Sequence, residues 1–250
     1  MSSSIWTQCA GDSRLSPLRI DVWRVVEAQH QVSTRKLVDT ADEQILLEEL
    51  IDRIKPPDRT RGSLHYLLAT PFRYPPLAHG SRFAGRYQPS IWYGSETRHT
   101  ALAEVAYYRF VFLAGTSAAL GPIATTLTAF TARASSDRAI DLTATPFDTH
   151  RSSIASPTNY AASQSLGDAM RAAGVELFRF ASARDETGVN VGVFAPGAFG
   201  RSKPRGFETW HCIASHEQVE FSKRDYFARG SMSFSREQFL VNGHLPAPAL

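Results

Sequence analysis

The chain has 250 residues, of which 43% are hydrophobic and 20% charged, and its 27 Lys+Arg against 24 Asp+Glu give a formal net charge of +3. This apolar fraction with so little net charge excludes a chain that is disordered throughout. The small net charge is weak evidence for nucleic-acid binding, because a total does not report how the charges cluster.

Cysteine usage and the N-terminus predict a cytoplasmic protein. Cys9 and Cys212 have no Cys/His neighbours at metal-ligand spacing, so we expect two free thiols and no structural zinc site. Residues 1–20 lack the basic and apolar regions of a signal peptide. The longest apolar-rich run, 111–124, is interrupted by Gly, Ser and Pro and is shorter than the ~20 residues that a bilayer requires. We therefore expect no membrane contact.

Hydrophobic periodicity predicts helices and strands along one α+β domain. In chain order we expect a loose polar tail at 1–19, a strand at 21–28, a helix at 42–54, short strands at 66–68 and 91–93, a helix at 97–110, strands at 123–133 and 139–142, a connection at 143–158, a helix at 160–173, and strands at 175–180, 189–194, 208–213 and 218–221. No internal repeat or composition shift divides the chain, so 20–250 is assigned to a single domain after the flexible tail.

Residues 64–96 differ in kind from the rest, because prolines, glycines, aromatic residues and arginines occur together without a long regular element. Arg73, Arg82 and Arg86 are interleaved there with aromatic residues, namely Phe72, Tyr74, Phe83, Tyr87, Trp92 and Tyr93. Guanidinium groups bind phosphates or carboxylates, and aromatic faces stack on a base or a nicotinamide ring. The alternatives are solvated arginines on a surface loop, or a single-stranded RNA-binding surface. The net charge of +3 disfavours RNA binding.

Two further residues are candidates for chemistry. Glu104 flanks the apolar stripe of the helix expected at 97–110, where a carboxylate is costly unless it is hydrogen-bonded or used. Its alternative is an ordinary helix glutamate that reaches solvent. Ser182 follows a predicted strand, where a hydroxyl beside backbone amides suits a phosphate or ribose oxygen, although serine is also a common turn residue.

Several catalytic and cofactor motifs do not occur in the sequence. Ser182 lies between Ala181 and Ala183, outside any GxSxG elbow, so an α/β-hydrolase has no support. Without a GxGxxG or GxxxxGK[ST] loop, neither a Rossmann cofactor nor P-loop chemistry is indicated. The eight histidines form no HxxxH or HExxH pair, and we expect no metal. A dinucleotide is therefore expected only as a substrate.

Arg82, Glu104 and Ser182, taken together, resemble the signature of the RES-domain family, which is named for Arg, Glu and Ser. The family pattern of Gly-x-Arg-aromatic, a strand ending in Tyr and a helix with Ala-Leu-x-Glu is similar to Gly80/Arg82/Phe83, Ile91–Tyr93 and Ala101–Glu104. The distal family motif, an aromatic residue and Ser-x-Arg-Asp before an apolar strand, resembles Phe180–Asp185 followed by VNVGVF.

The resemblance spans roughly residues 20–220, and 20–63 look like an N-terminal extension of the domain. One position allows two alignments, because Gly85-Arg86-Tyr87 also has the shape Gly-Arg-aromatic. The spacing to Tyr93 and Glu104 favours Arg82 over Arg86 as the family arginine.

The resemblance implies a toxin of a bacterial toxin–antitoxin pair, with the mixed β-sheet core and surrounding helices of ADP-ribosyltransferase toxins. Members of the family consume NAD as phosphorylases or glycohydrolases, or transfer ADP-ribose to a protein, and the sequence does not separate these reactions. NAD is then a substrate, inorganic phosphate a second substrate in phosphorolysis, and no cofactor is implied. The implied partner is an antitoxin that covers the active site and contacts nucleic acid on the toxin's behalf; homo-oligomerisation is left open.

The resemblance also implies roles for the site residues. As catalytic residues, Arg82 would grip a diphosphate or ribose oxygen, Glu104 would hold the ribose hydroxyls or support the cationic anomeric carbon, and Ser182 would orient the nicotinamide end or a phosphate. Further NAD contacts are expected from Tyr93 beside the nicotinamide or ribose, Arg73 as a second clamp, and Tyr74, Phe83 and Arg86. The remaining alternative, from another class, is a non-catalytic RNA-binding module.

Overall fold

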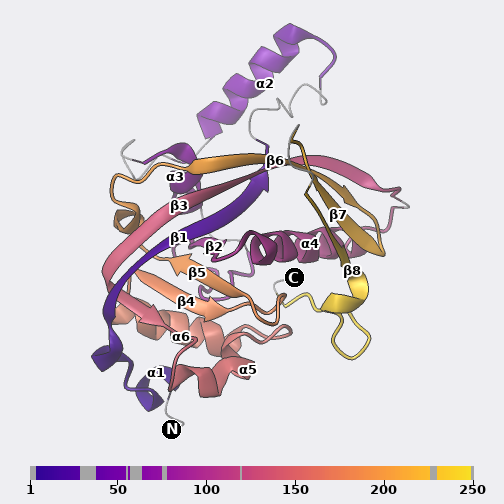
Figure 1. Ribbon diagram of the computed structural model, residues 1–250. Coiled ribbons are helices and arrows are strands. Elements are labelled where there is room, and N and C mark those ends of the chain that lie inside the picture. Colours follow the sequence, from indigo (N-terminus) through magenta and orange to yellow (C-terminus); the bar gives the residue numbers. More distant parts are fainter. Residues whose placement is uncertain are drawn as a thin grey trace.

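The computed structural model of the protein describes residues 4–28, 38–54, 56, 64–74, 78–118, 120–225 and 230–248 (Figure 1). Within these ranges, eight strands form one mixed sheet in the order β1-β2-β5-β4-β3-β6-β7-β8. The strands are β1 (Ser16–Glu27), β2 (Trp92–Ser95), β3 (Ile123–Asp141), β4 (Leu177–Ala181), β5 (Val189–Val193), β6 (Arg205–Ala214), β7 (Gln218–Lys223) and β8 (Ser231–Ser235). The predicted α+β class with a mixed sheet is confirmed.

Five of these strands close into a ring. β1 pairs with β2 on one side and with β3 on the other, while β2, β5, β4 and β3 pair in turn. The β3–β4 pair is parallel, and the other four pairs of the ring are antiparallel. One buried cluster joins the ring strands and includes Val22, Trp92, Phe130, Leu177 and Val191. Because closure removes free strand edges, the ring holds its strands in a fixed register.

β3 connects this ring to the rest of the sheet. Its first half pairs antiparallel with β6, which continues through β7 to β8. The β3–β6 register shifts between Ala129 and Thr131, the kind of irregularity that increases the local twist of a sheet. A second buried cluster, which includes Leu102, Phe110, Trp210 and Phe221, packs one helix against β6, β7 and β8.

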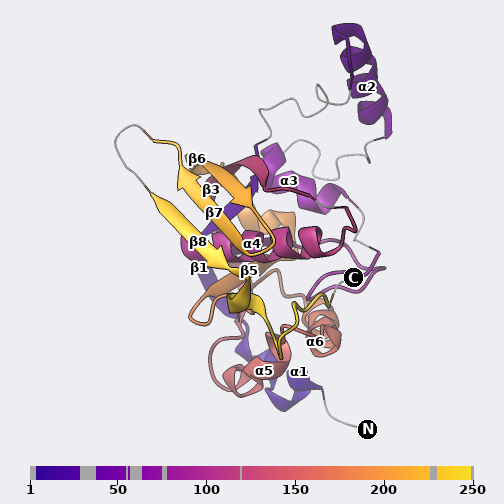
Figure 2. The same cartoon turned by 90° about the vertical axis from the view of Figure 1, so that its right-hand side faces the viewer.

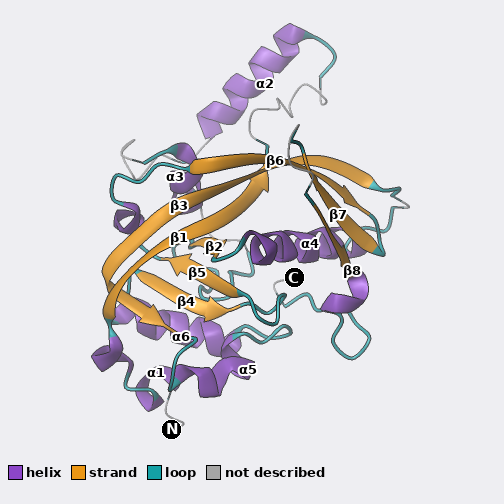
Figure 3. Ribbon diagram, in the orientation of Figure 1, coloured by secondary structure: helices purple, strands orange, loops and turns teal. Residues whose placement is uncertain are grey.

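Helices cover the sheet from more than one side (Figure 2, Figure 3). The described α-helices are α1 (Ile5–Gln8), α2 (Ala41–Ile54), α3 (Tyr66–Arg73), α4 (Arg98–Ala114), α5 (Arg151–Ile154) and α6 (Ala161–Ala172), and short 3-10 helices occur at Gly11–Arg14, Phe147–His150, Pro196–Phe199 and Arg236–Phe239. α1, α5 and α6 lie together below β4 and β5 in the view of Figure 1, whereas α4 lies between the ring and β8. α2 stands clear of the rest in both views.

α4 carries part of the candidate site, and its sequence accounts for its position. The Thr97 side chain caps the helix by accepting a hydrogen bond from the Thr100 backbone N–H. Small and large apolar residues follow at helical spacing, and Leu102, Ala106 and Phe110 are almost completely buried. The helix is therefore fixed along its length against the sheet.

Most predicted elements are confirmed within a few residues, including the helices at 42–54 and 160–173. The two strands predicted at 123–133 and 139–142 are one continuous strand, β3. The connection predicted at 143–158 contains α5 and a 3-10 turn, and β8 was not predicted.

Two predictions for the N-terminal part are wrong. The residues predicted as a loose tail form α1, a 3-10 turn and the start of β1, because Trp6 and Cys9 insert into the core beside α6. The strand predicted at 66–68 belongs to α3, whose first turn is capped by the His65 side chain and whose Leu67, Leu68 and Ala69 are buried. In both places a few buried side chains outweigh the local polar or proline-rich composition.

Both cysteines are free, as predicted, and the structure shows that both are buried. Burial raises the pKa of both thiols, that of Cys212 to about 11. None of the helices in the described ranges has the length and apolar character needed to cross a bilayer.

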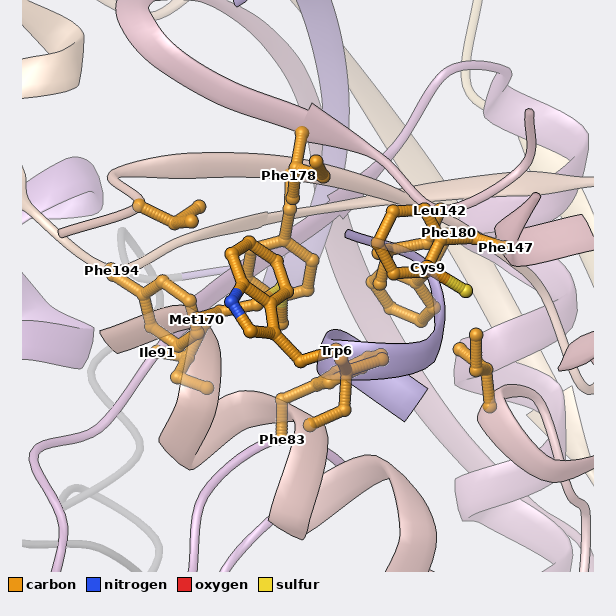
Figure 4. Close-up of a cluster of buried hydrophobic side chains, with 14 of the residues drawn as sticks. Trp6, Cys9, Phe83, Ile91, Leu142, Phe147, Met170, Phe178, Phe180 and Phe194 are labelled. Carbon is orange, nitrogen blue, oxygen red and sulfur yellow. The ribbon is translucent and has the colours of Figure 1, made fainter. Parts of the chain in front are cut away.

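Replacing Trp6 tests whether the N-terminal segment belongs to the core. Trp6 is 6% exposed and packs near Phe147 in the cluster shown in Figure 4. Trp6→Ala should lower the free energy of unfolding by about 3–5 kcal/mol, because removal of a large buried aromatic side chain leaves a cavity in the core. Denaturant unfolding measures this loss. Asp12→Ala is the control, because Asp12 belongs to the same N-terminal segment but its side chain is exposed. A loss below about 1 kcal/mol would show that the segment is peripheral.

Candidate active site

A cavity of about 340 Å³ opens between α4 and the ring of strands. Its lining comes from β1, β2, β4, β5, α4 and the turn at 81–82, and the charged lining residues are Arg24, Arg82 and Glu104. The volume lies within the range typical of small-ligand sites. With two cations against one anion, the lining is suited to a negatively charged molecule.

Glu104 is held through one of its two carboxylate oxygens. Oε1 accepts hydrogen bonds from the Ser182 hydroxyl at 2.7 Å and from Asn190 Nδ2 at 2.6 Å. The Asn190 amide is oriented in turn by Ser95, whose hydroxyl donates to Oδ1 at 2.6 Å. Among the described residues none donates a hydrogen bond to Oε2, which is therefore available to a molecule in the cavity.

The Ser182 hydroxyl lies behind Glu104 and does not line the cavity. It is 4% exposed, donates to Glu104 and accepts from the backbone N–H groups of Arg184 at 3.0 Å and Asp185 at 3.1 Å. The Ser182 side chain therefore supports Glu104 from outside the cavity lining, and the role expected for it at the nicotinamide end or at a phosphate stays a prediction.

The next two residues of the Ser-x-Arg-Asp motif fix this turn to α4. The Arg184 guanidinium carbon lies 3.4 Å from the centroid of the Tyr107 ring. Asp185 accepts a hydrogen bond from Thr100 Oγ1 at 2.7 Å and lies 3.1 Å from His99 Nδ1. Burial opposes ionisation of Asp185, but hydrogen bonds from Thr100 and His99 prevail and lower its pKa. The motif is thus a clamp between the turn and α4.

A tight turn presents Arg82 to the cavity. Gly80 has a φ of +73°, and a Cβ there would lie 2.2 Å from the Ala84 carbonyl oxygen, so the turn requires glycine. The Tyr93 hydroxyl staples the turn, since it accepts from the Phe83 N–H at 3.2 Å and pairs with the Ser81 hydroxyl. Burial raises the pKa of Tyr93 to about 12, so its phenol stays protonated at neutral pH.

Arg82 is positioned by neutral groups. Its Nη1 donates to the carbonyls of Ser156 at 2.8 Å and Ile154 at 3.3 Å, and its guanidinium lies 4.5 Å from the Tyr160 ring centroid. The described residues form no ion pair with Arg82, so its charge is available to a negatively charged group in the cavity.

Arg24, on β1, is a second cation of the same kind. Its Nη1 donates to the Tyr93 carbonyl at 2.8 Å, and its guanidinium lies 4.9 Å from the Trp92 ring. Removal from water lowers its pKa to about 10, which still leaves it protonated at neutral pH. No carboxylate of the described chain pairs with it.

Four of the residues predicted to contact NAD lie outside the cavity lining. Arg73, at the end of α3, donates to the Pro56 carbonyl. Tyr74 is 40% exposed, and its carbonyl accepts from the Ser90 hydroxyl.

Phe83 and Arg86 are the other two. Phe83 is fully buried and meets Phe178 and Phe180 edge-on, with ring centroids 4.8 Å apart in both pairs (Figure 4). Arg86 is exposed and donates to the Tyr87 hydroxyl. Of the two arginines that fit the family pattern, Arg82 lines the same cavity as Glu104, and Arg86 does not. Phe83 and Trp92 of this segment are fully buried, whereas Tyr74 and Tyr87 are exposed and lie outside the cavity lining.

Two cavity residues, Arg24 and Asn190, were missed in the sequence. Each is a polar residue on an otherwise apolar strand, Arg24 between Val22 and Val26 on one face of β1, and Asn190 within VNVGVF. A polar residue at an apolar alternating position is an informative signal, because burial there is costly without a use.

Comparisons with known proteins agree with the pattern of residues. A family model for the RES domain matches residues 53–217. The chain belongs to the RES-domain family. No curated protein matches it in sequence. Among solved structures, a chain from the M. tuberculosis MbcT–MbcA toxin–antitoxin complex is similar, with a TM-score of 0.49 and 11% identity over 82% of this chain and 91% of that chain.

The RES-domain match does not include β1, although β1 contributes Trp23, Arg24 and Val25 to the cavity. The cavity of this RES-domain protein is thus completed by residues from 20–63, the segment that looked like an extension. Among the described residues, no group of three His, Cys, Asp or Glu side chains is arranged to hold a metal ion.

Asn190→Asp tests the hydrogen bonds that hold Glu104. A second carboxylate beside Oε1 cannot ionise together with Glu104 without cost, so one pKa of the pair rises in the folded state. The unfolded-state pKa of a carboxyl group is about 4. A carboxyl whose pKa is higher in the folded state contributes stability to the fold below about pH 4, and this contribution is lost as the pH rises through the folded-state pKa. The melting temperature should therefore fall furthest below wild type near about pH 8, and the difference should shrink toward about pH 4.5.

Thermal unfolding across this pH range is the measurement. Ser95→Ala, which removes the hydroxyl that orients Asn190 without adding a charge, serves as control and should lower the melting temperature by a similar amount at each pH. An equally pH-independent loss for Asn190→Asp would contradict the placement of the residue 190 side chain against Glu104 Oε1.

Proposed function

We propose that this RES-domain protein cleaves NAD at the nicotinamide–ribose bond, as the toxin of a toxin–antitoxin pair. The observation that carries the proposal is the content of the cavity: one carboxylate fixed through a single oxygen, and two arginines without a carboxylate partner among the described residues. This set matches NAD, which has an anionic diphosphate at its centre and, at one end, a cationic nicotinamide ring joined to ribose by the glycosidic bond.

The arginines account for recognition of the diphosphate. Guanidinium groups make paired hydrogen bonds to phosphate oxygens, and such charged contacts are stronger in a cavity than in open water. The guanidinium groups of Arg24 and Arg82 donate to backbone carbonyls and lie over aromatic rings. These contacts fix their positions without neutralising their charges. Their charges are therefore balanced when a diphosphate binds.

Glu104 accounts for the bond that breaks. Nicotinamide leaves as a neutral ring with the electron pair of the C–N bond, and positive charge develops on the anomeric carbon and ring oxygen of the ribose. The free Oε2 of Glu104 can stabilise that charge or hold the ribose hydroxyls. An oxygen of water or phosphate, or an acceptor side chain, then bonds to the anomeric carbon, and a water nucleophile gives up its proton to solvent.

An antitoxin partner has support from the rim of the cavity. Tyr108 lines the cavity and is 56% exposed, and Phe112, one turn further along α4, is 59% exposed. Aromatic residues are enriched in surfaces that a partner protein covers. A partner seated there would close the entrance to the cavity.

Glu104→Gln should abolish most NAD cleavage without unfolding the protein. Losing one stabilising charge at the reacting centre costs on the order of 10²–10³ in rate. Nicotinamide release from NAD by the purified protein measures the effect, and Glu186→Gln, an exposed position in the turn after Ser182, is the matched control. Wild-type rates in Glu104→Gln would refute this role.

Arg24→Met should weaken substrate binding more than it slows the chemical step. Its guanidinium lies at the cavity wall, and loss of a hydrogen bond to a charged group corresponds to about 10- to 100-fold in KM. Steady-state kinetics separate KM from kcat, and Arg53→Met, on the exposed face of α2, removes an arginine remote from the cavity. An unchanged KM would exclude a diphosphate contact.

The products identify the acceptor. Incubation with NAD, with and without inorganic phosphate, distinguishes ADP-ribose 1″-phosphate from free ADP-ribose, and a labelled protein in a cell extract identifies ADP-ribosyl transfer. Absence of nicotinamide release under all three conditions would overturn the proposed function.

A further inference from the structure

A second hollow lies away from the cavity and is strongly basic. It has a volume of about 440 Å³ and shares no lining residue with the cavity at Glu104. Its charged lining residues are Arg19 on β1, Arg133 on β3, and Arg201, Lys203 and Arg205 around the start of β6. All five are exposed, so the hollow is a feature of the surface.

The excess positive charge of the chain is concentrated here. Asp21 is the acid that pairs with this group, and removing it and the five cations from the totals of 27 and 24 leaves 22 Lys+Arg against 23 Asp+Glu. The rest of the chain is therefore close to neutral. A net charge of +3 conceals a local concentration of cations, and local concentration decides binding to polyanions.

Asp21 organises part of the hollow. Arg133 donates to both of its oxygens, at 3.0 and 2.8 Å, and Arg205 donates to Oδ1. These hydrogen bonds and charges lower the pKa of Asp21 and raise that of Arg133. Within the described chain, Arg19, Arg201 and Lys203 have neither an ion-pair nor a hydrogen-bond partner for their side chains. Three cations are thus free beside two that are fixed.

The backbone that forms the hollow is well anchored. The Arg133 N–H donates to the Ser202 hydroxyl at 3.2 Å, and Thr131 Oγ1 donates to the Arg205 carbonyl at 3.1 Å. Phe199, whose backbone precedes this segment, is buried against Trp92 with ring centroids 5.0 Å apart. The cations are therefore presented from a preformed surface, which reduces the cost of ordering them on binding.

The lining favours phosphate over a protein partner. Four of the five cations are arginines, and Ser135, Ser202 and exposed glycine backbone lie among them. A Cβ added to Gly197 or Gly200 would meet nothing within 4 Å, so the backbone there faces open space. Its apolar lining residues, Ala198 and Phe199, are buried, so the hollow has no exposed aromatic or aliphatic anchor of the kind that protein interfaces use.

We infer that this hollow binds the sugar–phosphate backbone of a nucleic acid, independently of sequence. Arginine, hydroxyl and backbone N–H groups are the donors that contact phosphates in protein–nucleic acid complexes. This contact is separate from NAD cleavage, and it would be made by this chain itself, in addition to any contact made through an antitoxin.

Binding of a fluorescein-labelled 20-base-pair duplex, followed by anisotropy, tests the inference. At a physiological salt concentration of about 150 mM, the wild-type protein should bind with a dissociation constant in the range of about 1–100 µM. Five phosphate contacts should weaken binding roughly 500-fold between about 50 and 200 mM salt. Arg201→Glu/Lys203→Glu, which reverses two of the unpaired cations, should bind more than about tenfold less tightly, and the same change in salt should cost it only roughly 40-fold.

Arg53→Glu/Arg224→Glu is the matched control, because it changes the net charge equally at exposed positions outside the hollow. The inference fails if the wild-type protein does not bind at low salt, or if the control loses as much affinity as the hollow variant. It also fails if a poly-glutamate peptide of equal charge binds more tightly than the duplex, which would identify an acidic protein as the ligand. Nicotinamide release should be the same in both double variants, so loss of one activity leaves the other proposal intact.

Discussion

A carboxylate that is partly withdrawn from water needs compensation, and Glu104 receives it from two neutral donors, Ser182 and Asn190, both on Oε1. Ser182 directly follows the end of β4 and Asn190 lies in β5, and Ser95, which orients Asn190, lies directly opposite it in the β2–β5 pairing. A one-residue slip of β5 would turn Asn190 to the other face of the sheet, and a slip of β2 would do the same to Ser95. The ring of strands is therefore required for the hydrogen bonds that hold the Glu104 carboxylate.

Neutral donors have a further effect on the electrostatics of the cavity. Because Glu104 is not paired with a cation, Arg24 and Arg82 keep their full charge, and these are in turn held by carbonyls and aromatic rings. Two like charges that line one cavity repel each other, and a ligand that carries negative charge would relieve that repulsion. Because the carboxylate and the arginines of the described chain are not paired with one another, the cavity lining carries both an unpaired anion and unpaired cations.

Local patterns were sufficient for much of this arrangement. Periodicity placed α4 and α6, and the Gly-x-Arg, Ala-Leu-x-Glu and Ser-x-Arg-Asp segments led to Arg82, Glu104 and Ser182. What local patterns could not supply is which side of each strand faces the cavity. Phe83 is an aromatic residue of the kind that stacks on a base, but it fills the core. Arg24 lies in β1, whose two partners in the ring, β2 and β3, are about 70 and about 105 residues away in sequence, and local patterns do not predict such distant pairings.

The N-terminal strand also has a consequence for how the family domain is delimited. A polypeptide trimmed to the residues that match the RES-domain model would begin after β1. The ring would then be an open sheet, with β2 and much of β3 lacking a neighbour on one side. Unprotected edges of that kind recruit strands from other molecules, so the trimmed chain would be prone to aggregate instead of simply losing activity. The boundary of the sequence match and the boundary of the folding unit are different places in this protein.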